Sequence, residues 1–144
     1  MLTSRDQQHG AVLRQIVKHG GQCQSIQSGF GQYEVDNSKL FLIKYCGRAS
    51  SWQFTIRRHD IQGLVEYQFS SFFEQSFLAL NCRNKEVCIL GFDEWSTVLD
   101  VESPADQQTI TLRRSKNCGF VVSGSGGSLD RTIPKSRLSN VVAA

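Results

Sequence analysis

Residues 77–99 predict four consecutive elements, and no other part of the sequence limits the fold as much. Two runs rich in Leu, Val, Ile, Phe and Cys flank the polar turn at 83–86, which is the pattern of an inner β-hairpin. Asp93 follows where a helix N-cap is expected, because its carboxylate can accept free backbone N–H groups of the first turn. Trp95 and Val98 then begin an apolar helix face. The block predicts a packed α/β scaffold and contains no recognisable catalytic group.

Hydrophobic periodicity predicts the other elements. Helices are expected at 9–18 and 58–74, and strands at 23–28, 33–35, 39–46, 51–56, 109–113 and 119–123, with an irregular turn or short helix within 129–144. Hairpins outnumber crossover connections in this order. We therefore predict an α+β domain built on one mixed, mainly antiparallel sheet of about five to seven strands, with two or three helices packed on it.

The length of 144 residues is that of one ordinary domain. We expect a single domain over 1–144, with residues 1–8 and 139–144 loose. The predicted core combines the inward positions of the expected elements: Val12, Ile16, Leu42, Trp52, Phe54, Leu64, Leu78, Leu80, Ile89, Leu90, Trp95, Leu99, Ile110 and Val121.

The composition is that of a globular protein, with 40% hydrophobic and 20% charged residues. No apolar run reaches the ~18 residues that a membrane span needs, and the N-terminal MLTSRDQQHG has charges and glutamines where a signal peptide has its apolar stretch. The five cysteines include no C-x-x-C pair, which favours buried free thiols in a reducing compartment. We therefore expect a cytoplasmic protein with no membrane partner and no cofactor. One alternative stays open, since Cys82 and Cys88 flank the same turn and are able to form a disulfide or share a metal.

The net charge of +3 conceals an uneven distribution. Residues 1–106 carry ten Lys or Arg against twelve Asp or Glu, whereas residues 107–144 carry six against Asp130 alone. A basic end attracts phosphates, so these six cations are candidate anion-binding residues: Arg113, Arg114, Lys116, Arg131, Lys135 and Arg137. The expected anion is a nucleic-acid backbone, a phosphorylated small molecule or an acidic patch on a protein. The alternative is that the cations solvate a sheet edge and a loose tail.

A glycine-rich segment, SGSGG at 123–127, lies close in sequence to these cations. Backbone N–H groups of such a loop are able to hold a phosphate. Established phosphate loops lead directly into a helix N-terminus, however, and Pro134 with its β-branched neighbours argues against a prompt helix here. The alternative is a surface loop that ends the last hairpin.

A metal-dependent nuclease of the restriction-endonuclease-like class, either active or degenerate, is an alternative function. Its sites need an acid at a strand start and, on the next strand, a second acid two residues before a lysine, so that two carboxylates hold Mg²⁺ beside a cation. Asp36 and Lys44 follow this order, but Leu42 occupies the position of the second acid, and Glu34 would have to replace it. The alternative makes Asp36 a turn residue and Lys44 a solvent-facing strand residue.

His59 and Asp60 are the one adjacent pair of histidine and carboxylate, which suits a general base with an orienting partner. Adjacent helical residues project about 100° apart, and Asp60 also suits the first turn of a helix, so we expect a structural role. No G-x-S-x-G nucleophile elbow is present in the sequence. We therefore expect that the chain is not an enzyme. The non-catalytic rival is a small-molecule binder with an apolar pocket between helix and sheet.

Four stretches, KLFLIKYC, SWQFTI, FLALNC with VCIL, and VSGSGGSLDRTIPKSRL, resemble a group of short bacterial proteins associated with mobile DNA, including integron gene cassettes. The resemblance runs through most of the chain from Lys39 onward. It implies a compact, often self-associating bacterial domain. That group has no assigned activity, so no functional residues are carried over. We accordingly expect a non-catalytic binding or regulatory module from mobile DNA.

The aromatic residues Phe69, Phe72 and Phe73 share one face of the helix expected at 58–74. Together with the resemblance, they predict self-association, most simply as a two-fold dimer. The alternative is that these side chains pack in the core against Trp52 and Phe54.

Overall fold

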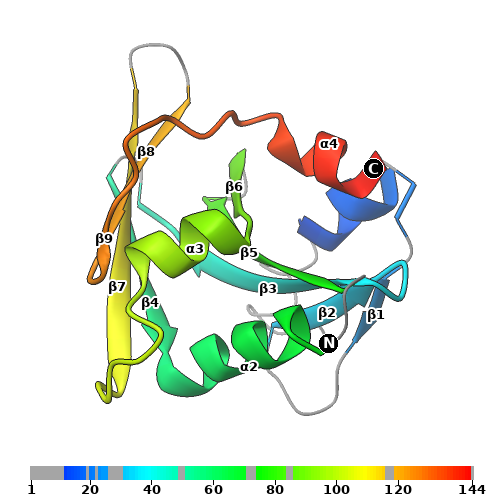
Figure 1. The fold of residues 1–144 in the computed structure, drawn as a ribbon. Helices are drawn as coiled ribbons and strands as arrows, with labels where there is room; N and C mark the ends of the chain where they lie inside the picture. The colour runs from blue at the N-terminus through cyan, green and yellow to red at the C-terminus, as the bar shows by residue number, and fades with distance from the viewer. Residues whose placement is uncertain are drawn as a thin grey trace.

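The strands form two β-sheets (Figure 1). The first has the order β1-β2-β3-β5-β6, with β1 at Cys23–Ser25, β2 at Gln32–Val35, β3 at Lys39–Cys46, β5 at Gln75–Cys82 and β6 at Glu86–Leu90. The second has the order β4-β7-β8-β9, with β4 at Trp52–Arg57, β7 at Gln107–Arg114, β8 at Phe120–Gly124 and β9 at Gly127–Ser128. The sequence pattern predicts one sheet; the strands divide between two because β4 pairs with β7 and not with β3.

The computed structural model describes residues 12–18, 20–21, 23–25, 31–48, 51–70, 74–83, 86–115 and 119–143. Helical segments among them are residues 12–18, α2 (Arg58–Gln68), α3 (Phe92–Val98) and α4 (Arg137–Ala143). The predicted α+β class is confirmed. No helix within the described residues is long and apolar enough to cross a membrane.

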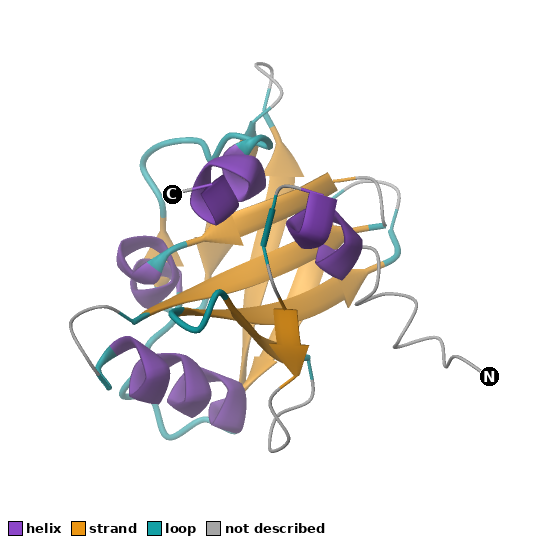
Figure 2. Cartoon of the chain, turned by 90° about the vertical axis from the view of Figure 1, so that its right-hand side faces the viewer, coloured by secondary structure: helices purple, strands orange, loops and turns teal. Residues whose placement is uncertain are grey.

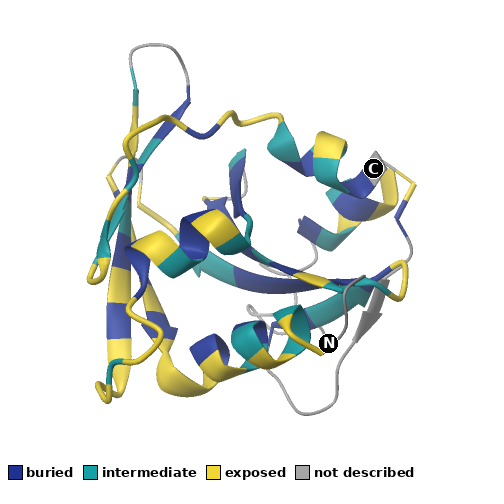
Figure 3. Ribbon diagram, viewed as in Figure 1, coloured by how far each residue is buried: buried dark blue, intermediate teal, exposed yellow. Residues whose placement is uncertain are grey.

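The parallel pair β3–β5 lies at the centre of the first sheet, in register from Lys39 opposite Gln75 to Cys46 opposite Cys82. Both strands are covered on two faces over most of their length, which explains their nearly continuous apolar sequence. Strands β4 and β7 face solvent on one side, so their buried and exposed residues alternate (Figure 3). The continuous and the alternating runs in the sequence therefore belong to different sheets.

Two apolar layers cover the two faces of the first sheet. One lies between this sheet, the second sheet, α2 and α3, and is centred on Trp95, Leu64 and Phe54. The other packs the 12–18 segment and α4 over the opposite face, through Ile16 and Leu138 (Figure 2). The two layers share the strands β3, β5 and β6, which contribute alternate side chains to each.

The predicted core residues are buried with one exception. Val121 is half-buried, whereas its neighbour Val122 is fully buried. Adjacent strand residues point to opposite faces, so a one-residue error in register exchanges the two.

Two differences from the sequence prediction concern the helices. Helix α2 ends at Gln68 and not near residue 74, because the backbone N–H and the hydroxyl of Ser70 both donate to the Tyr67 carbonyl and close the last turn. The C-terminal residues are helical in α4, with Val142 buried, where the pattern predicts a loose end from 139. Residues 1–8 lie outside the described part of the chain.

Gly124 joins the second sheet to α3 at close range and provides a test of this packing. A Cβ atom at Gly124 would lie 2.3 Å from the Val98 carbonyl oxygen, which is backbone and cannot rotate away. We expect Gly124→Ala to lower the free energy of unfolding by about 1–3 kcal/mol in urea denaturation. Gly47→Ala is the matched control, because the heavy atoms nearest to its Cβ would belong to the Tyr45 side chain, at 3.3 Å or more. Equal stabilities of the two variants would contradict this packing.

Candidate functional site

The six predicted anion-binding cations do not form one site. Arg113 and Arg114 end β7, whereas Arg131 lies before α4 and Arg137 is its first residue. Lys135 is exposed, and Lys116 lies outside the described residues. The sequence block 107–144 is therefore basic as a segment, but its charges are distributed over separate parts of the surface.

The first group, Arg113 and Arg114 on the second sheet, lies beside two arginines that follow strands of the first sheet. Arg114 forms an ion pair with Glu86 at the start of β6, and its guanidinium lies 6.0 Å from the centre of the Trp52 ring. Trp52 Nε1 donates a 2.8 Å hydrogen bond to the Arg48 carbonyl. The Arg83 backbone N–H donates to the Cys46 carbonyl at 2.8 Å, which holds the end of β5 beside the end of β3.

Four exposed arginines thus gather at one end of the molecule: Arg48, Arg83, Arg113 and Arg114, which we call the basic end. Arg48 and Arg83 follow β3 and β5, and the carboxyl ends of parallel strands meet at the same edge of a sheet. Sequence analysis missed both residues. Their positions directly after strong strands were visible, but the parallel pairing that brings them together was not.

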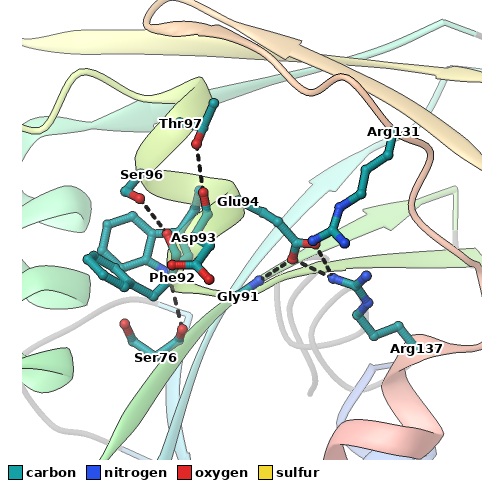
Figure 4. A network of polar contacts seen from close by, with 10 residues as sticks. Ser76, Gly91, Phe92, Asp93, Glu94, Ser96, Thr97, Arg131 and Arg137 are labelled. Carbon is teal, nitrogen blue, oxygen red and sulfur yellow. Dashed lines mark hydrogen bonds and ion pairs between the residues drawn. The ribbon is translucent and has the colours of Figure 1, made fainter.

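The positive charges of the second group, Arg131 and Arg137, are compensated by a buried acid. Arg131 and Arg137 both form ion pairs with Glu94, with Arg131 3.1 Å from Glu94 Oε2 (Figure 4). Glu94 is 4% exposed and also accepts a 2.9 Å hydrogen bond from the Gly91 backbone. The helix N-cap is therefore Gly91, with Glu94 at N3, and the prediction of Asp93 as N-cap is wrong. The sequence contained a signal for this N-cap, because Glu94 lies three residues after Gly91.

Glu94, Arg131 and Arg137, which we call the Glu94 cluster, border a cleft of about 400 Å³ between β5 and the start of α3. The charged residues around it are Asp93, Glu94, Arg131 and Arg137, so the two signs balance. The two arginines attach the C-terminal segment to α3. They leave no excess positive charge for an anion.

The glycine-rich segment at 123–127 packs against protein and not around a free space. The Ser125 N–H donates to the Thr109 carbonyl and the Gly126 N–H to the Val98 carbonyl, at 3.1 and 2.8 Å. A Cβ at Gly126 would lie 2.6 Å from the Leu99 carbonyl carbon. The glycines thus allow the β8–β9 turn to approach the end of α3, and these two backbone donors are already used.

The residues of the alternative nuclease site are not brought together. Glu34 accepts a 2.8 Å hydrogen bond from Tyr67, and Asp36 occupies the β2–β3 turn with a positive φ of 53°. Glu34 pairs with Leu40 of β3. Lys44 lies four residues beyond Leu40, so Glu34 and Lys44 are about 13 Å apart along the strand direction.

Lys44 instead forms a 2.8 Å ion pair with Asp60, which is 1% exposed. Asp60 also accepts from the Arg57 N–H at 2.9 Å, as the first-turn role predicts. His59 Nε2 lies 3.4 Å from Asp60 Oδ1, so the expectation that these adjacent side chains diverge is wrong. The helix begins at Arg58, so both residues lie in its first turn.

Cys46, Cys82 and Cys88 are free thiols, so the alternative Cys82–Cys88 disulfide is not formed. Burial, and secondarily the nearby Cys46, raises the pKa of the Cys82 thiol to about 12. Burial also raises the pKa of Cys88 well above its ordinary value. Both thiols therefore stay protonated at neutral pH. Among the described residues, no three His, Cys, Asp or Glu side chains are placed to share a metal ion.

Comparison with protein families, with curated proteins and with solved structures finds no match to this chain.

Glu94 is the residue whose removal tests the assignment of Arg131 and Arg137 to structure. We expect Glu94→Ala to lower the free energy of unfolding by about 2–3 kcal/mol, because it removes a helix cap and leaves two arginines without their acid. Chemical denaturation measures this loss. The exposed neighbour Asp93→Ala serves as control and should cost less than about 1 kcal/mol. A Glu94→Ala variant as stable as this control would show that the cluster contributes nothing to the fold.

Proposed function

We propose that this chain is a non-catalytic binding module that contacts an anionic polymer, a nucleic-acid backbone, through its basic end. One observation carries the proposal: Arg48, Arg83, Arg113 and Arg114 are exposed at strand ends of both sheets, and contacts through Trp52, Glu86 and the Cys46 carbonyl hold these strand ends together. Their charge greatly exceeds that of Glu86, the acid paired among them. Planar guanidinium groups bind phosphate oxygens in pairs, which suits this residue type.

The distribution of the arginines favours an extended anion over a single phosphate group. All four are exposed, and they are spread over the ends of β3, β5 and β7. A nucleic acid presents phosphates in a row, so each of several separated cations is able to contact a phosphate. As part of the same proposal, the module acts on bacterial mobile DNA in the cytoplasm, and the free thiols favour such a reducing compartment.

The two rival functions have less support. For a nuclease, Glu34 already accepts a hydrogen bond from Tyr67, and Lys44 is already ion-paired with Asp60. Leu42 is fully buried at the position of the second acid. For an apolar small-molecule site, the cleft lined by Ile61 and Val65 measures only about 250 Å³ and also contains charged residues. Drug-sized ligands occupy pockets of roughly 300–1,000 Å³.

Titration of labelled DNA and RNA at several salt concentrations tests the proposal. We expect a triple variant, Arg48→Ala, Arg83→Asn and Arg113→Ala, to bind about 100-fold more weakly at low salt, with a log–log salt slope shallower by roughly 2–3. Asn replaces Arg83 because this position has a positive φ of 57°, which Asn tolerates. Arg114 is kept, since it packs on Trp52.

The matched control removes the same charge from exposed positions elsewhere, with Arg14→Ala, Lys18→Ala and Lys135→Ala. This variant should bind nearly as well as the natural chain. If both triple variants lose affinity equally, the binding depends on net charge only, and the basic end is not a site.

We also propose that the protein forms a two-fold dimer that covers Phe69. This side chain is 67% exposed and packs edge-on against Phe92, while Phe72 and Phe73 lie outside the described residues. Light scattering should give twice the 16.2 kDa of one chain. Phe69→Ser should reduce the dimer fraction, and Val17→Ser, at another exposed apolar position, should not. A monomeric mass at high concentration would refute the dimer.

A further inference from the structure

Two cysteines lie directly opposite each other at the carboxyl end of the parallel pair β3–β5. Cys46 is in register with Cys82, and the Arg83 N–H donates to the Cys46 carbonyl at 2.8 Å, so the two strands are still paired at this point. Both side chains contact the apolar layer that is centred on Trp95. The two thiols therefore lie on the same face of the sheet.

The spacing of these two residues suits a disulfide. Neighbouring strands lie about 4.8 Å apart, and disulfide-bonded cysteines have Cα atoms roughly 4.4–6.8 Å apart. Cys88 is less well placed, because it lies opposite Leu80 and is the diagonal neighbour of Cys82. Diagonal neighbours are about 7–8 Å apart, which is too far for a disulfide without movement of the backbone. Cys88 also lies two strands away from Cys46. Among the three thiols that the structure describes, Cys46 and Cys82 are therefore the pair that can be joined.

The two thiols differ in their access to solvent. Cys46 is half-buried, whereas Cys82 is 1% exposed. Burial also raises the pKa of the Cys82 thiol to about 12, so Cys82 is protonated at neutral pH and is a poor first nucleophile. An oxidant in solution therefore meets Cys46 first, and Cys82 lies beside it as the thiol that closes the bond. Many redox-sensing sites have this arrangement of an accessible thiol next to a resolving thiol.

We propose that Cys46 and Cys82 are an oxidation site at which a peroxide forms a reversible disulfide between β3 and β5. The Cys46 sulfur attacks one oxygen of hydrogen peroxide and breaks the O–O bond, which gives a sulfenic acid and releases water. The Cys82 sulfur then displaces the hydroxyl group of the sulfenic acid, and the Cys82 proton leaves with that hydroxyl as a second water molecule. The two thiols together lose two electrons, and the peroxide gains them. A dithiol reductant reverses the reaction by thiol–disulfide exchange at the half-buried Cys46 sulfur.

The new bond lies at the basic end. Arg83 directly follows Cys82, and Arg48 lies two residues after Cys46. Arg114 is also near Cys82, since its charge favours the thiolate against the larger effect of burial. Oxidation therefore joins the two strand ends that carry Arg48 and Arg83. The oxidation site does not depend on the proposed nucleic-acid binding, because the bond itself is what the experiment measures.

Peptide mapping of the full chain by mass spectrometry tests the proposal. The chain is treated with hydrogen peroxide at neutral pH, its remaining thiols are blocked, and trypsin then cleaves it after Lys and Arg. Each of the five cysteines falls in a different peptide, with Cys46 in 45–48, Cys82 in 59–83 and Cys88 in 86–113. We expect peptides 45–48 and 59–83 to be linked, and the intact mass to be that of one chain less two hydrogen atoms. Dithiothreitol should remove the link.

Variants assign the role of each thiol. Cys46→Ser should abolish the link, and the matched control Cys88→Ala, which removes another thiol near Cys82, should retain it. In Cys82→Ala, the sulfenic-acid reagent dimedone should label Cys46, because no second thiol closes the bond. Circular dichroism checks that each variant is folded, and the map of the natural chain decides the question if a variant fails to fold. The absence of a link, a link from 59–83 to 86–113 in its place, or a disulfide between two chains would overturn the proposal.

Discussion

The parallel pairing of β3 with β5 is the constraint on which the rest of the structure depends. Eight consecutive residues of each strand are in register, and the segment between them must return the chain to the same edge of the sheet. That return contains β4 and α2. It places a helix and the first strand of a second sheet over one face, so the second sheet is a consequence of the crossover. The opposite face is left for the 12–18 segment and α4.

The same pair also determines where the basic end lies. Arg48 and Arg83 follow its carboxyl ends, whereas Leu40 and Glu74 lie at its amino ends. The basic end and Glu74 are therefore separated by the length of the strands. The paired strands are eight residues long, about 26 Å, which exceeds the Debye length of about 8 Å at physiological salt, so charges at the two ends do not neutralise each other. In another part of the molecule, Glu94 compensates the positive charges of Arg131 and Arg137.

Local pattern predicted the elements well where one short-range rule dominates. The hairpin and helix of residues 77–99 appear in order as β5, β6 and α3, and β3 has the predicted bounds Lys39–Cys46. Prediction failed where a single side chain decides the outcome. Glu94 and not Asp93 caps α3, and Ser70 ends α2 before the phenylalanines. Of the sites, the sequence indicated Arg113 and Arg114 of the basic end but neither of their partners from the first sheet.

The sequence by itself determined most of the buried apolar positions, because alternating and continuous apolar runs follow from the two-residue period of a strand. It also determined the α+β class and the excess of cations after residue 106. Only the tertiary structure decided which of those cations share a buried acid. Arg131 and Arg137 are compensated by an acid about forty residues earlier, while Arg113 and Arg114 join two arginines from another sheet. Charge adds up along a chain, but its effect depends on neighbours in space, and these are fixed by strand pairing that local pattern does not reveal.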